Sequence, residues 1–202
     1  MNSKKVAINN ALSAGYTYKE YRELVSDHVI FKTTSGPNQT DALINYTKLN
    51  HARMKRLDKT TIIPQAHQTL FSNYQKKLTW LVLSESWCGD AAQSLPVLNK
   101  IALLMPKLTF KIAFRDQHKL LMEYFKTNNA MAIPKLIIID HTSKEVVGQW
   151  GPRPSIASKM VASYKAAHGT LSQEFKKELQ VWYTQDKGRN IIEDISRLLI
   201  TL

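Results

Sequence analysis

The chain has 202 residues, of which 28 are Lys or Arg and 16 are Asp or Glu, so its formal net charge is +12. This length suffices for one domain with a substantial core and helical additions. A single cysteine excludes a framework of internal disulfides, and no run of 18 apolar residues predicts a transmembrane helix. Residues 1–15 are polar and form no apolar signal segment, so we expect a reducing, cytoplasmic compartment.

The positive charge is spread along the whole chain. The first 60 residues hold ten Lys and Arg against five acids, and the remainder holds 18 against eleven. The nearest approach to a basic patch is Arg53, Lys55, Arg56 and Lys59, near the end of a predicted helix, where cations are favourable for local reasons. Nucleic-acid binders more often gather charge on one face with interleaved aromatics, so nucleic-acid binding is only the weakest alternative.

Two helices are predicted in residues 1–60, which we interpret as an N-terminal helical extension. Thr17 and Glu20 have the spacing of a capping box, and apolar positions follow to residue 30. The breaker Ser-Gly-Pro-Asn at 35–38 ends this helix. A second helix is predicted from about 40 to 58, because apolar residues recur there at helical spacing.

Residues 61–168 alternate apolar strands with helical segments, and this alternation is typical of an α/β core. Residues 141–144 join the last two strands in a hairpin. The helix that follows, 155–168, is expected to pack back on the sheet. A C-terminal helical extension, 169–202, follows with two further helices, and the three parts are expected to pack as one globular unit. The predicted elements are helix 64–77, strand 78–84, helix 89–104, strand 109–115, helix 117–129, strands 135–140 and 145–149, and helices 155–168, 171–185 and 190–201.

The most informative segment is Trp87-Cys88-Gly89-Asp90-Ala91, which contains the only cysteine. It follows the buried strand and opens a helix that carries Pro96. A cysteine at this junction meets the positive end of the helix, where unpaired N–H groups stabilise a thiolate. Cys88 is therefore a candidate nucleophile.

This arrangement resembles the active-site region of the thioredoxin superfamily, in which W-C-G-x-x follows a strand and a proline-kinked helix begins. A second match is Ile133-Pro134, followed by the apolar strand 135–139; thioredoxins carry an Ile-Pro with a cis bond at this separation. The segment 110–116 resembles their central strand. The resemblance covers about 61–168 and implies an α/β, thioredoxin-like fold with added N-terminal and C-terminal helices.

The departures from that family limit the chemistry. The second family cysteine is replaced by Ala91, the proline between the two cysteines by Asp90, and the buried acid of the preceding strand by Val82. Without a partner cysteine, Cys88 cannot complete a dithiol–disulfide cycle within one chain. The segment resembles a single-cysteine, W-C-G-D branch of bacterial thioredoxin-like proteins.

The neighbours of Cys88 allow two interpretations each. The helix terminus should lower its pKa, while Asp90 and Glu85 should raise it, and Cys88 itself is either a reactive thiol or a small buried hydrophobe. Asp90 either exchanges a proton with a bound thiol or only stabilises the first helical turn. Trp87 either shields the sulfur or packs in the core, and Gly89 either permits close approach of a partner or only shapes the turn.

The resemblance also places a peptide groove beside the sulfur. Ile133, before a cis Pro134, would offer its backbone groups to an extended partner peptide; the alternative is a trans turn proline without a partner. After the last strand, Trp150 and Arg153 either lie on the surface beside Cys88 or belong to a segment whose prolines only end the strand and begin a helix.

We therefore expect a cytoplasmic monothiol protein in which Cys88 forms mixed disulfides with a low-molecular-weight thiol or a client protein. The alternative is a non-catalytic module that keeps the peptide groove. Enzymatic activity stays open, and a self-sufficient dithiol reductase is excluded. No cofactor and no membrane partner are expected. The six histidines are scattered, so no metal site is expected either.

Overall fold

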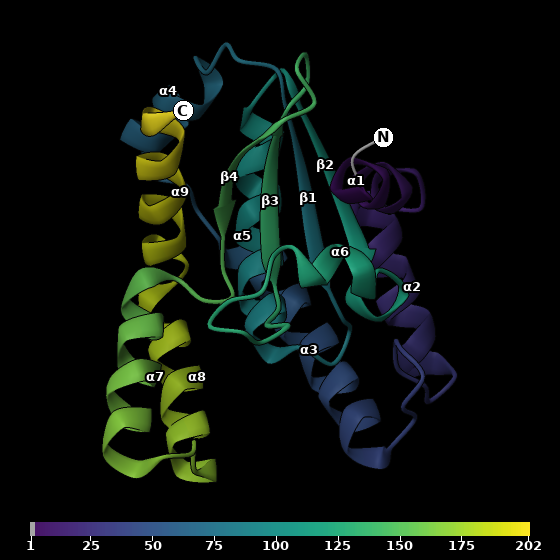
Figure 1. Ribbon diagram of the computed structural model, residues 1–202. Helices are drawn as coiled ribbons and strands as arrows, with labels where there is room; N and C mark the ends of the chain where they lie inside the picture. The colour runs from purple at the N-terminus through teal and green to yellow at the C-terminus, as the bar shows by residue number, and fades with distance from the viewer. Residues whose placement is uncertain (1–2) are drawn as a thin grey trace.

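The computed structural model describes residues 3–202 and is built around one mixed sheet (Figure 1). The strand order is β2-β1-β3-β4. Strand β1 pairs in parallel with the edge strand β2, with Leu78 opposite Leu108, whereas β3 runs antiparallel to both of its neighbours. The strands are β1 Leu78–Ser84, β2 Leu108–Phe114, β3 Lys135–Asp140 and β4 Val146–Trp150.

Helices flank this sheet (Figure 1). Helix α5 crosses behind the strands, α3 and α9 pack against α5, and α1 and α2 lie beside β2. Every residue of β1 is buried, as expected of a strand between two covered faces. The helices of the body are α1 Ser3–Ser13, α2 Tyr18–Ile30, α3 Asp41–Thr60, α4 Gln65–Ser72, α5 Gly89–Leu104, α6 Lys119–Glu123 and α9 Arg189–Thr201.

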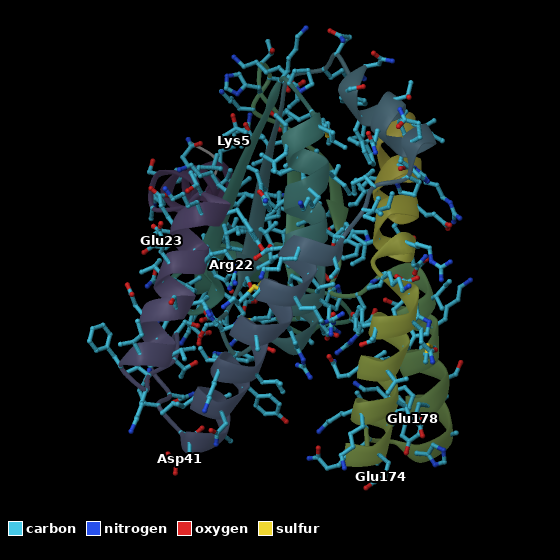
Figure 2. The ribbon with its side chains drawn as sticks, turned by 180° about the vertical axis from the view of Figure 1, so that it is seen from behind. Lys5, Arg22, Glu23, Asp41, Glu174 and Glu178 are labelled. Atoms are coloured by element: carbon cyan, nitrogen blue, oxygen red, sulfur yellow. The ribbon has the colours of Figure 1, made fainter. Side chains whose placement is uncertain are left out.

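Capping explains where the two long N-terminal helices begin. Thr17 accepts from the N–H of Glu20, and the Glu20 carboxylate accepts from the N–H of Thr17, which completes the predicted capping box. Thr40 caps α3 by accepting from Leu43 N. Arg22 of α2 then pairs with Asp58 of α3 at 3.2 Å, and Figure 2 shows Arg22 between these helices.

Three elements of the structure differ from the prediction. Helix α1 was not predicted, because only Ala7, Ile8 and Ala11 in its polar sequence are buried and their packing stabilises it. The predicted helix 117–129 is a 3-10 turn, Arg115–Gln117, followed by the short α6; a turn with left-handed residues at 128 and 129 prevents its continuation. The helix predicted to reach residue 77 ends at Ser72.

The prediction that residues 155–168 pack back on the sheet is wrong. Helix α7, Ser155–His168, pairs with α8, Gln173–Asp186, in a helical hairpin that extends beyond the sheet (Figure 1). The hairpin encloses its own small apolar cluster. Instead, α9 covers the sheet, and its Leu198 approaches Gly148 of β4. The reason is composition: α9 buries a full stripe of isoleucine and leucine, while α7 buries only Ala157 and Val161.

Candidate functional site

Cys88 lies at the junction of β1 and α5 and is the N-cap residue of that helix. Its side chain is buried, with 7 % of the residue exposed. The Cys88 Sγ donates to the carbonyl oxygen of Ile133 at 3.3 Å. The Ile133–Pro134 bond is cis, and this segment leads directly into β3. The only cysteine and the Ile-Pro segment, 45 residues apart in the chain, are therefore in direct contact.

The surroundings of Cys88 favour the neutral thiol. Burial raises its pKa to about 12, and the negative charge of Asp90 adds to this rise. The backbone N–H groups of Ala91 and Asp90, together with the charge of Arg153, act in the opposite direction. The helix terminus thus lowers the pKa as expected from the sequence, but desolvation outweighs it.

Asp90 is held by two side chains from distant elements. Arg153 Nη2 lies 2.7 Å from Asp90 Oδ2, and the hydroxyl of Tyr183 donates to Oδ1 at 3.0 Å. The side chains of Asp90 and Arg153 are 11 % and 25 % exposed. Burial raises the pKa of Asp90, and Arg153 and Tyr183 partly offset this effect. A carboxylate, a guanidinium and a phenol are thereby assembled next to Cys88.

Glu85 lies on the other side of the loop and is fully buried. Its carboxylate accepts from Asp116 N at 2.8 Å and from the hydroxyl of Ser35. Burial raises its pKa, and these bonds oppose the rise. Glu85 therefore ties the end of β1 to two neighbouring loops, and the largest charge effect on the pKa of Cys88 comes from Asp90 instead.

Ser86, next in the chain, anchors the loop that connects β1 to Cys88. Its hydroxyl bonds with those of Thr34 and Thr47 at 3.1 and 3.0 Å and accepts from Ser35 N at 2.9 Å. Its carbonyl accepts from Asn50 Nδ2 at 2.9 Å. All of these groups are buried, so the loop is held rigidly from α3 and from the segment before it.

Trp87 and Gly89 flank the cysteine at the edge of the site. Trp87 is half-buried, and the guanidinium of Arg115 lies 5.1 Å from its ring centroid. A Cβ atom on Gly89 would come within 3.5 Å of Arg53 Nη1 and 3.9 Å of Gln180 Nε2. These are ordinary contact distances, so side chains of α3 and α8 lie beside the start of α5, and the space at this position does not itself require glycine.

Not every predicted groove residue faces the sulfur. Ile133 contacts Cys88, and Arg153 reaches it through Asp90. Trp150 is 8 % exposed, and its Nε1 donates to Asp194 of α9 at 3.1 Å, so most of it packs against α9.

The comparisons with known proteins agree with this geometry. Residues 36–165 match the family Thioredoxin_9, whose description is "Thioredoxin". The chain belongs to this family. No curated protein matches it.

Two solved structures share the fold of this Thioredoxin_9 protein. One is a protein of unknown function from Pseudomonas aeruginosa, 16% identical, with a TM-score of 0.58 over 78% of this chain and 90% of that one. The other is an HIV epitope scaffold, also 16% identical with a TM-score of 0.58, over 78% and 91%. At this identity the likeness shows the fold alone.

The family match ends at residue 165, so all of α8 lies beyond it. Tyr183 and Gln180, which α8 brings to the start of α5, were not predicted as site residues. No motif marks them, and their positions depend on how the hairpin packs. Arg53 was noted in the sequence only as part of a basic stretch.

Two further observations concern the described part of the chain. Between residues 3 and 202, no three His, Cys, Asp or Glu side chains gather as a metal site would require. Over the same residues, no helix is both long and apolar enough to cross a membrane.

Proposed function

We propose that this Thioredoxin_9 protein is a monothiol protein whose Cys88 forms mixed disulfides with a small thiol or a client protein. The observation that carries the proposal is the Asp90–Arg153–Tyr183 cluster beside the only cysteine. Burying an ion pair costs desolvation energy that well-packed apolar side chains would avoid. Titratable groups with perturbed pKa values gather preferentially at functional sites.

In the proposed reaction, the Cys88 sulfur attacks one sulfur of a partner disulfide. As the new S–S bond forms, the partner's S–S bond breaks and its second sulfur leaves as a thiolate. The proton of the Cys88 thiol passes to the Asp90 carboxylate and from there to the leaving thiolate. A second external thiolate then attacks the mixed disulfide, and Cys88 leaves as a thiolate that takes up a proton. Asp90 thus serves as base and acid in place of the missing second cysteine.

The resting site is closed, because the thiol is buried and its hydrogen bond occupies the Ile133 carbonyl. A partner that pairs with the backbone at Ile133 would compete for this carbonyl and release the thiol. Because a partner must bind before the thiol is released, reaction with bound partners is favoured over reaction with oxidants that do not bind at the site. The proposed compartment is a reducing cytoplasm, which can supply the external thiol.

The test is intact-mass analysis after incubation with oxidised glutathione or bis(2-hydroxyethyl) disulfide, with Cys88→Ser as the blank. We expect one adduct per chain on the wild type, reversed by excess thiol. Asp90→Asn should lower the pKa of Cys88, because it removes the charge that raises it, and should slow adduct formation near neutral pH, where the Cys88 thiol is protonated and its proton must pass to Asp90. Asp41→Asn, at the exposed start of α3, is the matched control. No adduct on the folded wild type with either disulfide would overturn the proposal.

The second candidate is a binding module without redox activity, favoured by the burial of Cys88 and by its raised pKa. In that case Cys88→Ser would bind partners captured by the wild type with unchanged affinity. Loss of binding in Cys88→Ser, with capture of a partner that reducing agent releases, would exclude the module.

A further inference from the structure

A cavity of about 410 Å³ lies between α3 and α8, and the proposed reaction does not use it. Its wall includes Arg53 and Arg56 from α3, Gln93 from α5, and Gln180 and Thr184 from α8. No carboxylate is among the residues that line it. The cavity therefore combines two cations with several neutral polar groups.

The positive charge of this cavity is not neutralised by the protein. Within residues 3–202, neither Arg53 nor Arg56 forms an ion pair. The Arg53 guanidinium donates from Nη1 to Asn50 Oδ1 at 3.1 Å. Asp90 is the acid whose charge acts on Arg53, and it is already paired with Arg153. Two acids of α8, Glu174 and Glu178, lie at the free end of the hairpin, away from α3 (Figure 2). The third, Asp186, accepts from Asn190 N and does not line the cavity.

Arg53 is also partly withdrawn from water. Burial lowers its pKa, and the neighbouring charge of Arg56 lowers it further. Two guanidinium groups placed together without an acid are unfavourable unless an anion binds between them. The planar fork of arginine suits the two oxygens of a carboxylate or phosphate.

The polar groups around the arginines can complete such a site. Gln93 Nε2 donates to Gln180 Oε1 at 2.9 Å, which orients Nε2 of Gln180 away from Gln93. Within residues 3–202 this Nε2 donates to no acceptor, so it is free to donate to a ligand. The cavity thus offers amide and guanidinium donors from two separate helices.

The position of the cavity links it to Cys88. Arg53 Nη1 and Gln180 Nε2 are the two groups that a Cβ on Gly89 would meet, and Gly89 directly follows the cysteine. A molecule held by these groups would therefore lie beside the first turn of α5. The N–H groups of that turn also favour a negative ligand.

We propose that this cavity binds the carboxylate of a small acidic thiol whose sulfur pairs with Cys88. This inference rests on the proposed function and specifies its partner: an anionic low-molecular-weight thiol in preference to a neutral or cationic one. Arg53 and Arg56 recognise the charge, and Cys88 exchanges the disulfide.

The test compares rates of mixed-disulfide formation on Cys88 with oxidised glutathione, which carries carboxylates, and with neutral bis(2-hydroxyethyl) disulfide. Arg56→Gln is the main variant because Arg56 is exposed and its loss should leave folding intact. Lys48→Gln, on an exposed position of the same helix outside the cavity, is the control with the same change in net charge. Arg56→Gln should slow the glutathione reaction about tenfold and leave the neutral reaction unchanged, whereas Lys48→Gln should alter neither.

A second measurement separates this inference from the proposed function. Calorimetric titration of Cys88→Ser with reduced glutathione should show binding that Arg56→Gln weakens about tenfold, whether or not any mixed disulfide forms. Equal glutathione rates for Arg56→Gln and Lys48→Gln, or a titration without binding, would overturn the acidic-thiol site. Binding of inorganic phosphate to Cys88→Ser as tight as that of glutathione would also overturn it, because the cavity would then recognise a free anion.

Discussion

The sheet-centred body and the α7–α8 hairpin are stabilised differently. The body has one continuous apolar core, which α1, α2, α5 and α9 share with the sheet. The hairpin has a separate small cluster and meets the site through polar contacts, such as Tyr183 with Asp90 and Gln180 with Gln93. Because hydrogen bonds contribute less than buried apolar area, the hairpin should open before the body unfolds. Opening would expose the site without loss of the fold.

The largest expected effect is in the body. Trp80 of β1 is fully buried and meets Phe110 edge to face, with ring centroids 6.3 Å apart. Trp80→Ala should lower the free energy of unfolding by about 3–5 kcal/mol, because it leaves a large cavity in the core. Urea unfolding followed by circular dichroism measures this. A loss below about 1 kcal/mol would contradict the single continuous core.

The matching change in the hairpin should behave differently. Phe175 of α8 stacks on Tyr164, with ring centroids 4.0 Å apart. Phe175→Ala should loosen the hairpin and accelerate alkylation of Cys88 in the native protein. The rate should rise about tenfold for each 1.4 kcal/mol lost from the free energy that holds the hairpin against the body. Val181→Ala, on an exposed position of α8, is the control. If urea unfolding shifts as far as for Trp80→Ala while alkylation stays unchanged, the two regions are one cooperative unit.

A smaller change should weaken only the contact between the regions. Tyr183→Phe removes the hydroxyl that donates to Asp90, a bond to a charged group that contributes about 1.5–3 kcal/mol. We expect faster alkylation of Cys88 and a higher pKa for Asp90, since the lost bond lowers that pKa. Tyr164→Phe, which loses a hydroxyl contact with Ser172 inside the hairpin, should change neither value. Equal effects of the two variants on alkylation would show that hairpin stability, and not the Asp90 contact, closes the site.

The last expected effect concerns alkaline pH. Burial raises the pKa of Cys88 to about 12 in the folded protein, whereas a free thiol has a pKa of about 8.5. The stabilisation from the neutral buried thiol is therefore fully present at pH values below the pKa of the free thiol, about 8.5, and is lost as the pH rises toward 12. Between pH 9 and 11, wild-type stability should fall relative to Cys88→Ser by up to about 1.4 kcal/mol per pH unit. Parallel pH curves for the two proteins would show that the thiol is exposed in solution.

Local sequence patterns were sufficient for the central part of this protein. The continuous apolar run of β1 predicted a fully buried strand, and the junction after it placed Cys88 at the start of α5. Ile133-Pro134 was expected beside the sulfur from the resemblance to thioredoxins, and the structure shows their contact. The strand and the helix start were predictable because strand burial and helix starts depend on neighbouring residues in the chain, whereas the contact with Ile133 was expected only from the resemblance.

The tertiary structure alone decided what surrounds the thiol. Tyr183 lies 93 positions from Asp90 in the chain, and no local pattern predicts that they meet. Whether Cys88 is charged depended on a balance between helix N–H groups and desolvation, and desolvation depends on how tightly distant segments cover the sulfur. Sequence determined which residue is the thiol and where the helix behind it begins. Packing between distant elements determined its burial, its partners and the basic cavity beside it, because these depend on contacts that form only when the whole chain has folded.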